Sequence, residues 1–449
     1  MATNGQTPAA TTQPDCSAAL AAVRKAAADG RLAWKLSGVD ELKDVLGEPR
    51  SESERRDGGM LLLQVEFRCG LAVFGRMAAS DAPYTLLGLT VGPVPEGWKG
   101  ADLPPGAEII DIGRDRSITL RNADDLKKFN DMWGVAGVSL AKLDLTGQEK
   151  LLRAMTFDTR TAWPPAERLP AGFDPDKILQ DGKDPGLGIR GLHRLGINGA
   201  GVHIAIIDQP HAPNHIEYGS QIEQYKEIGV AGVPPQMHGP PVASIAVGKT
   251  CGVAPAARLW YYAVPMWKAD NTPYCDAMDD ILAYNEKAKA ADRIRAVSIS
   301  TGMFLHQEHY DRWQQTMRRA AEAGLLVITC AQGEIRYGTA GREPGAGPND
   351  PRSYRPGKYG TGESVLLVPA DNRTTASHHG PKVYTYWAEG GMSWAAPYLA
   401  GVAVLGYQIN PDLKPQDVLD ALRNSAAVTD AGHVVNPVGF IEAIRPRDK

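Results

Sequence analysis

The sequence has few cysteines, and they lie far apart. Its 449 residues include five of them: Cys16, Cys69, Cys251, Cys275 and Cys330. No two are separated by only two residues, which excludes the CxxC pair typical of zinc sites and redox motifs. An odd number in so long a chain also argues against a disulfide framework. We therefore expect free thiols in a reducing compartment.

The sequence also lacks the features that direct a chain to a membrane or to nucleic acid. Residues 1–15 contain no Lys, no Arg and no apolar core, so they do not have the pattern of a secretory signal. The most apolar helix candidate, residues 394–409, carries one proline and two glycines and is short for a membrane span. The net charge is −4, which excludes a strongly basic chain. We expect a cytoplasmic protein with no membrane or nucleic-acid partner.

Composition divides the chain into four parts. Residues 1–15 are rich in Thr, Pro, Ala and Gln and predict a disordered tail. Residues 16–160 mix helical and strand-like stretches and predict a smaller α+β N-terminal domain. Residues 161–186 are rich in Pro and Asp and predict a linker. In residues 187–449, short apolar runs alternate with helical stretches, which predicts an α/β domain with a mainly parallel sheet covered on both faces.

The N-terminal domain contains recognisable helix and strand signals. An alanine-rich stretch predicts a helix at residues 17–28. Apolar runs bounded by glycine, proline or polar turns predict strands at residues 60–68, 71–75, 85–91 and 108–112. Further helices are expected at residues 124–132 and 148–155.

The first candidate catalytic residue follows a buried strand. The run VHIAIID ends in Asp208. A carboxylate at the carboxyl end of a parallel strand points into the crevice where α/β proteins place their sites. Taken alone, an aspartate at this place is as well explained as the cap of the next turn.

The second candidate begins a helix. In MHGPPVASIAVG, His238 is followed by a glycine and two prolines, which are tolerated in the first helical turn. The helix dipole at that end lowers the proton affinity of an imidazole and keeps it able to act as a base. In isolation, His238 is better explained as a surface cap.

The third candidate is Ser393 in EGGMSWAAPYLAGVAVLG. Two glycines precede Met392 and Ser393 and leave room for a substrate backbone, and a long apolar helix follows. The positive end of that helix favours negative charge developing near the serine hydroxyl. A plain N-cap serine is the alternative, but it explains neither the glycines nor the apolar helix.

Together the three segments predict nucleophilic catalysis. A serine attacks an amide only when a base removes its proton, and that base needs a third group to orient it. The chain order here is Asp208, His238, Ser393, which is the order found in subtilisin.

The three segments resemble the active-site blocks of the subtilase family, whose usual forms are Asp-Thr-Gly, His-Gly-Thr-His-Val-Ala-Gly and Gly-Thr-Ser-Met-Ala-Ala-Pro. The stretch GVAPAARL behind the His block and VNPVGFIEAI near the end are also similar, so the likeness covers about residues 187–446. It implies a subtilisin-like three-layer domain that hydrolyses peptide bonds through an acyl-enzyme, with a peptide or protein substrate. It also implies that Ser300, Thr301 and Gly302 pair with the extended substrate. No aspartate cluster matches a calcium-binding loop, so we expect no metal and no cofactor.

The sequence departs from the family pattern near each predicted catalytic residue. Asp208 is followed by Gln-Pro instead of Thr-Gly, Pro241 replaces the second His, and Met and Trp flank Ser393. The family's oxyanion Asn falls in Ala-Ala-Gly-Asn, where this chain has CAQG. Gln332 is the nearest amide and our candidate oxyanion donor, although an ungapped count places Gly333 opposite the Asn. Losing one such donor costs about 10²–10³ in rate.

Other functions remain open at this point. A weak oxyanion hole fits a pseudoprotease or a peptide-binding module, and an amine in place of water turns the same acyl-enzyme into a transpeptidase or peptide cyclase. The N-terminal domain is an accessory or recognition domain, a removable inhibitory segment or an oligomerisation module. A nonenzymatic assembly factor acting through that domain is a further idea. The sequence does not indicate an oligomeric state.

Overall fold

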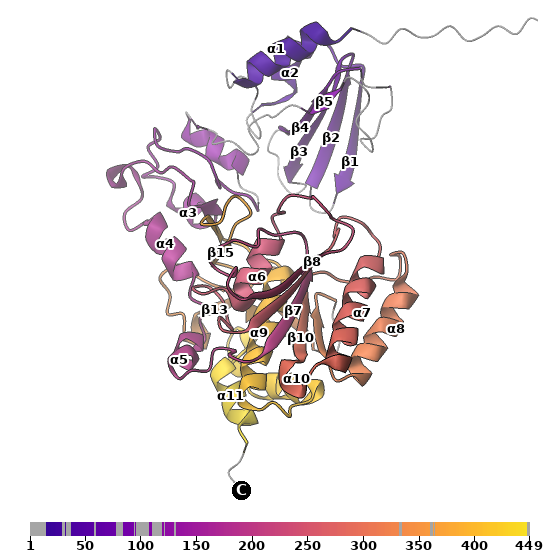
Figure 1. Ribbon diagram of the computed structural model, residues 1–449. Helices are drawn as coiled ribbons and strands as arrows, with labels where there is room; N and C mark the ends of the chain where they lie inside the picture. The colour runs from indigo at the N-terminus through magenta and orange to yellow at the C-terminus, as the bar shows by residue number, and fades with distance from the viewer. Residues whose placement is uncertain are drawn as a thin grey trace, which may run out of the picture. The chain divides into compact units, whose positions relative to one another are not determined.

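The structure is a computed structural model that describes residues 15–28, 32, 37–57, 60–77, 84–93, 95, 107–109, 119–120, 122–129, 132–331, 335–359, 362 and 364–446. It divides into two compact units (Figure 1). The first comprises Met1–Leu151 and Arg160–Pro170, and the second Leu152–Thr159 and Ala171–Lys449. The tail predicted at residues 1–15 lies outside the described residues, apart from Asp15.

The first unit is built on an antiparallel sheet in the order β1-β2-β3-β4-β5. Its elements are α1 (Ser17–Ala28), α2 (Val39–Leu46), β1 (Ser51–Asp57), β2 (Met60–Phe67), β3 (Gly70–Met77), β4 (Thr85–Val91), β5 (Glu108–Ile109), the 3₁₀ helices η1 (Ala123–Phe129) and η2 (Ala166–Arg168), and α3 (Glu149–Arg153). The predicted helix at 17–28 and strands at 60–68, 71–75 and 85–91 are confirmed. The helix expected at 124–132 is a 3₁₀ helix, and the strand expected at 108–112 is described only for two residues.

β1 is a strand that the apolar pattern did not reveal. Its sequence, SESERRD, has no apolar residue, and Ser51 to Arg56 are all exposed. It forms the edge of the sheet and pairs only with β2 in the sheet as described. Charged side chains on an edge strand discourage pairing with another chain.

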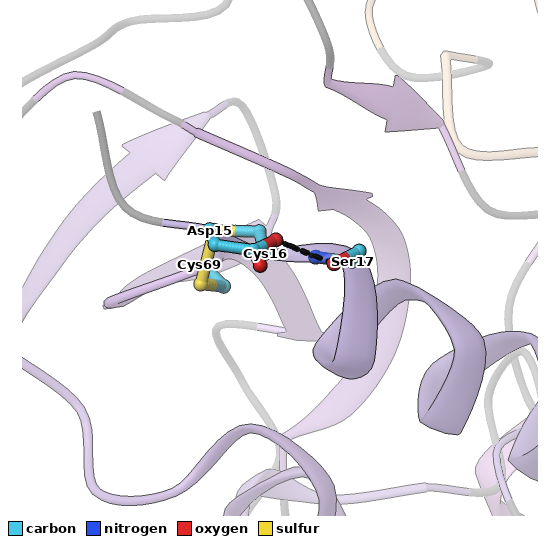
Figure 2. The surroundings of a disulfide bond; sticks show 4 residues. All are labelled: Asp15, Cys16, Ser17 and Cys69. Atoms are coloured by element: carbon cyan, nitrogen blue, oxygen red, sulfur yellow. Dashed lines mark hydrogen bonds between the residues drawn. A yellow bond between two sulfur atoms is a disulfide. The ribbon is translucent and has the colours of Figure 1, made fainter. Parts of the chain in front are cut away.

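A disulfide cross-links the first unit. Cys16, just before α1, is bonded to Cys69 in the turn between β2 and β3, with their Cα atoms 5.5 Å apart (Figure 2). Asp15 accepts a hydrogen bond from the Ser17 amide at 3.0 Å and so caps the helix beside the bond. The expectation of free thiols is therefore wrong for these two cysteines, which are brought together by packing across 53 positions of sequence. Cys251, Cys275 and Cys330 are free.

The second unit contains the predicted parallel sheet. Its strand order is β11-β10-β7-β9-β8, and every neighbouring pair is parallel. The strands are β7 (His203–Asp208), β8 (Ile222–Glu227), β9 (Arg258–Ala263), β10 (Ile294–Ile299) and β11 (Leu326–Thr329). The helices are α4 (Pro175–Gly182), α5 (Ile189–Arg194), α6 (Gly239–Val247), α7 (Thr272–Lys287), α8 (Tyr310–Glu322), α9 (Met392–Ile409), α10 (Pro415–Asn424) and α11 (Pro437–Ile444).

Helices cover both faces of this sheet because its central strand is apolar on both sides. On one face Ala205 and Ile207 pack with Met278 of α7 and Trp313 of α8. Figure 1 shows α7 and α8 on one side of β7 and β10, and α9 on the other. This arrangement confirms the predicted three-layer α/β fold.

Two smaller sheets complete the second unit. They have the orders β13-β12-β14-β18-β17 and β15-β16-β6. Their strands are β6 (Phe157–Asp158), β12 (Tyr337–Arg342), β13 (Tyr354–Pro356), β14 (Leu366–Pro369), β15 (Arg373–Ala376), β16 (Tyr384–Trp387), β17 (Ala427–Thr429) and β18 (Gly432–Val434). Two 3₁₀ turns, η3 (Ala290–Asp292) and η4 (Pro351–Ser353), connect other elements.

Part of the predicted linker is folded. α4 lies within residues 161–186, and the Asp174 carboxylate caps it by accepting from the Lys177 amide at 2.9 Å. Ile178 and Leu179 are buried, so a few well-spaced apolar residues are enough to pack this short helix. In the part of the chain that the structure describes, no helix is both long and apolar enough to cross a membrane.

Candidate active site

Asp208 and His238 form a close pair at the carboxyl edge of the parallel sheet. Asp208 is the last residue of β7 and is fully buried. Its Oδ1 lies 2.7 Å from His238 Nδ1 and also accepts from the Gln209 amide at 2.7 Å. Because an ionised carboxylate only accepts, the proton of the neutral imidazole lies on Nδ1, and Nε2 keeps its lone pair. This tautomer is the one a general base requires.

The close approach of His238 depends on the glycine that follows it. His238 is the N-cap of the fully buried helix α6, and Gly239 is the first helical residue. A Cβ on residue 239 would clash with the Gln209 carbonyl oxygen and the Tyr261 hydroxyl. Glycine therefore lets the helix start against the segment after Asp208.

Ser393 lies in the first turn of α9, whose N-cap is Gly391. Its Oγ donates to the Ser300 carbonyl oxygen at 3.1 Å, and Ser300 Oγ donates to the Ser393 carbonyl oxygen at 3.0 Å. Among the described residues, no hydrogen bond joins Ser393 to His238. The His238 ring instead lies 5.3 Å from the ring of Trp394, the next residue of α9.

The predicted substrate-binding residues follow β10. Ser300 is bonded to Ser393, and the Thr301 carbonyl oxygen accepts from the Cys330 amide at 3.0 Å. Gly302 is packed closely, because a Cβ there would lie 2.8 Å from the Phe304 ring. The structure therefore places Ser300 in hydrogen-bond contact with Ser393. Thr301 and Gly302 are the next two residues after Ser300. Gln332, the candidate oxyanion donor, and Gly333 lie outside the described residues.

Cys330 is a site residue that the sequence did not single out. It comes directly after β11, and its thiol lies near the side chains of Ser393 and Tyr337. Burial and then the charge of Asp208 raise the pKa of the thiol to about 12, although the neighbouring Ser393 and Tyr337 side chains oppose the shift. Cys330 is therefore a neutral thiol at pH 7 and does not compete with Ser393 as a nucleophile. The position of Cys330 directly after an apolar strand is the sequence feature that could have identified it as a site residue.

Asp371 is a second residue that was missed. It follows β14, and its Oδ1 accepts from the Gly390 amide at 2.7 Å. Burial, with a smaller contribution from the Glu389 charge, raises the pKa of this carboxyl to about 6, and the Gly390 hydrogen bond opposes the shift. Gly390 precedes Ser393 by three residues, so Asp371 holds the turn that leads into α9. The short sequence ADNR gives no sign of this contact.

One group of described side chains has the spacing of metal ligands. It consists of Asp270, Glu308 and His309, whose ligand atoms lie within 4.8 Å of one another. Glu308 and His309 are exposed, and Asp270 already bonds the Thr272 amide and His309 Nδ1 at 2.8 and 2.9 Å. These contacts explain the group as the start of α7 and α8, so we assign no metal to it.

Part of this chain is similar to a curated protease. Subtilisin-like protease PopC of Myxococcus xanthus (strain DK1622) is 26% identical over 282 residues, which are 53% of this chain and 58% of PopC. This chain thus spans about 58% of the length of the curated relative it matches.

Solved structures are more distant. The prenylagaramide maturation protease PagA is 16% identical, with a TM-score of 0.44, over 58% of this chain and 99% of PagA. Fervidolysin from Fervidobacterium pennivorans, a keratinolytic enzyme related to subtilisin, is 15% identical, with a TM-score of 0.45, over 58% of this chain and 45% of its own.

The family comparison covers most of the second unit. Residues 199–440, more than half of the chain, match the subtilase family (Peptidase_S8). This match confirms the resemblance found in the sequence and supports a serine-protease type of function. The chain belongs to the subtilase family.

Proposed function

We propose that this chain is a serine endopeptidase, with Ser393 as nucleophile, His238 as general base and Asp208 orienting that base. The observation that carries the proposal is the 2.7 Å contact between His238 Nδ1 and Asp208 Oδ1. A carboxylate in this position fixes the tautomer of the imidazole and stabilises the imidazolium that forms during the reaction.

The proposed reaction has two stages. His238 Nε2 takes the Ser393 proton while Oγ attacks the peptide carbonyl, and it then gives that proton to the leaving amine. Water, activated by the same histidine, then releases the acyl group. The backbone N–H of Ser393, in the first turn of α9, has no partner within the helix and is a donor for the oxyanion. Gln332 stays a prediction for the second donor.

The Ser393 hydroxyl has to change its partner before it attacks. In the structure it donates to the Ser300 carbonyl oxygen, so it must turn toward His238. A rotation about the Cα–Cβ bond would redirect this hydroxyl, and catalytic hydrogen bonds often form only when substrate is bound. In the proposal, the substrate adds as an extended strand beside Ser300, Thr301 and Gly302.

A pseudoprotease that only binds peptides is the second candidate. The hydrogen bond from Ser393 Oγ to the Ser300 carbonyl oxygen favours it, since a hydroxyl that donates there is not activated by His238. It differs from the first candidate in one measurable property, the reactivity of Ser393.

A fluorophosphonate reagent, which reacts only with an activated serine, separates the two. We expect the full chain to be labelled at Ser393 and Ser393→Ala and His238→Ala to resist labelling. Ser220→Ala, whose hydroxyl only bonds Gln221, is the matched control and should label normally. A folded wild-type chain that is not labelled would support the pseudoprotease.

Products then distinguish hydrolysis from transfer. Mass spectrometry of a peptide library cleaved by the full chain should show free carboxylates at the new ends. Joined or cyclic peptides in the presence of amine nucleophiles would indicate a transpeptidase or peptide cyclase using the same acyl-enzyme.

The cytoplasmic location predicted from the sequence stays a prediction. The disulfide between Cys16 and Cys69 weighs against it, because such bonds persist mainly in oxidising compartments. The first unit is best proposed as an accessory or recognition domain, with an inhibitory segment and an oligomerisation module as the alternatives. An intact N-terminus on the active protein would exclude the alternative in which the first unit is a removable inhibitory segment.

A further inference from the structure

Arg373 is a buried cation whose hydrogen-bonding groups are only partly used. It begins β15 and is 2% exposed. Its Nη2 donates to the Cys251 carbonyl oxygen at 3.1 Å, whereas Nε and Nη1 have no partner. Burying a polar group without a partner is unfavourable, and burying an uncompensated charge is more so.

No acidic side chain compensates this charge. Within the described residues, Arg373 takes part in no ion pair. Burial, and to a smaller extent the nearby Arg342 guanidinium, lowers the pKa of Arg373. Arg342 is also buried, and its Nη2 donates to the main-chain oxygens of Asp181 at 2.9 Å and Asp184 at 3.3 Å. Two buried positive charges therefore lie near each other.

Two carboxylates of the second unit, those of Asp184 and Glu217, have other partners. The Asp184 carboxylate accepts from the Gly186 amide at 2.8 Å and lies 3.9 Å from Arg190 Nε. The Glu217 carboxylate accepts from the Thr250 amide at 2.8 Å and from the Tyr384 hydroxyl. Among the described residues, neither carboxylate forms an ion pair or a hydrogen bond with Arg373.

The ring of Tyr398, a buried residue that carries a second unpaired donor, lies next to Arg373. The guanidinium carbon is 5.6 Å from the centre of the Tyr398 ring, on α9. Tyr398 is completely buried, and its hydroxyl has no hydrogen-bond partner. Burial raises the pKa of this phenol, so the hydroxyl stays protonated and able to donate. Two N–H groups and one O–H group are thus available in one buried region.

We propose that Arg373 and Tyr398 form a binding site for a small monovalent inorganic anion, of the size of chloride. Water would satisfy the donors but would leave the charge of the guanidinium, which cannot lose its proton, uncompensated. A chloride-sized anion accepts from both groups and also neutralises the charge. The bound anion would connect β15 and the Cys251 segment after α6 with α9.

Chloride dependence of stability is the test, and it does not depend on peptidase activity. The full chain is unfolded thermally in sodium chloride and in sodium gluconate at the same ionic strength, since gluconate is too large for the site. For a Kd of about 10 mM, raising chloride to about 100 mM increases the ratio of folded to unfolded protein about tenfold. An unfolding midpoint that is the same in both salts would overturn the proposal.

Matched variants locate the effect. Arg373→Met should abolish the chloride dependence, and Tyr398→Phe should weaken it. Tyr407→Phe is the control: Tyr407 is also a buried tyrosine of α9 with an unpartnered hydroxyl, but its ring lies over Arg295, whose guanidinium donates to the Pro411 and Leu413 carbonyls. This control should keep the full dependence. Unchanged dependence in both Arg373→Met and Tyr398→Phe would refute the site.

A bromide-soaked crystal gives a readout that remains available if Arg373→Met fails to fold. The expected result is an anomalous peak at hydrogen-bonding distance from Arg373 Nε or Nη1. Ordered water at that position, with no anomalous signal, would show that the donors are satisfied without an anion and would overturn the proposal.

Discussion

The two units of this chain are stabilised by different means. The first holds one antiparallel sheet whose edge strand, β1, has no apolar side chain, and a disulfide joins the start of α1 to the β2–β3 turn. The second has a parallel sheet with helices packed on both faces and keeps its three cysteines as free thiols. A unit with a small core gains from a covalent restraint, whereas a larger core supplies its own stability. The residues proposed for catalysis all belong to the second unit.

The largest expected effect concerns the residues proposed for catalysis, which all lie in the second unit. Asp208→Asn should lower kcat about 10⁴-fold, because an amide N–H facing His238 Nδ1 favours the wrong imidazole tautomer. Peptide cleavage by the full chain measures it. Asp125→Asn, an acid-to-amide change in the first unit, is the control and should leave kcat unchanged. Similar rates for wild type and Asp208→Asn would remove Asp208 from the proposed triad.

The second prediction tests how the larger unit is stabilised. Ile281 of α7 is completely buried in the core against the parallel sheet. Ile281→Ala should lower the free energy of unfolding of this unit by about 2–5 kcal/mol, from lost burial and the remaining cavity. Calorimetry of the full chain should show a lower midpoint temperature for the unfolding of the second unit and an unchanged midpoint for the first. Val428→Ala, at a side chain that is 78% exposed in the same unit, should change little.

The third prediction breaks the covalent restraint of the smaller unit. The double substitution Cys16→Ser, Cys69→Ser should destabilise the first unit by about 4 kcal/mol on the chain-entropy estimate for a 53-residue separation. The transition of the second unit should stay in place. A reducing agent should reproduce the shift in the wild type and have no effect on the double variant. Wild-type protein insensitive to reduction would mean that the cross-link does not form.

The smallest expected effect concerns Asp371, which holds the turn before Ser393. The folded-state pKa of Asp371, about 6, is above its ordinary value of 3.8, so the folded state holds this proton more tightly. Stability from this group is present in acid and is lost as the pH rises through 6, by about 1–3 kcal/mol. Asp371→Asn keeps an acceptor for the Gly390 amide and should remove that loss. Chemical unfolding of both proteins between about pH 4 and pH 7 measures it. Parallel pH profiles would contradict the assignment.

Much of the fold was predictable from local pattern. The apolar strands around VHIAIID and the helix after Ser393 follow from hydrophobic runs bounded by glycine and proline, and α1 follows from its alanines. The proposed triad depends on motifs of this kind, since a glycine or proline beside a catalytic residue leaves a trace in the sequence.

What was missed depends on contacts between distant segments. β1 has no apolar residue and exists because β2 pairs with it. Cys16 meets Cys69 only once α1 and the sheet have folded, and Asp371 meets Gly390 only when β14 and α9 are adjacent. α4 has too few apolar residues to stand out. Pairing, packing and burial are properties of the assembled chain, so a single sequence read locally does not display them.

The ring of Trp394 lies beside His238, so the fluorescence of Trp394 can report on the proposed base. Trp394 is buried, and its ring lies 5.3 Å from the imidazole and 5.5 Å from the ring of Trp387. An imidazolium accepts an electron from an excited indole, whereas the neutral ring does so much less. Emission from this indole therefore dims as His238 gains a proton, and the difference in fluorescence between wild type and Trp394→Phe records the titration of one histidine without any turnover.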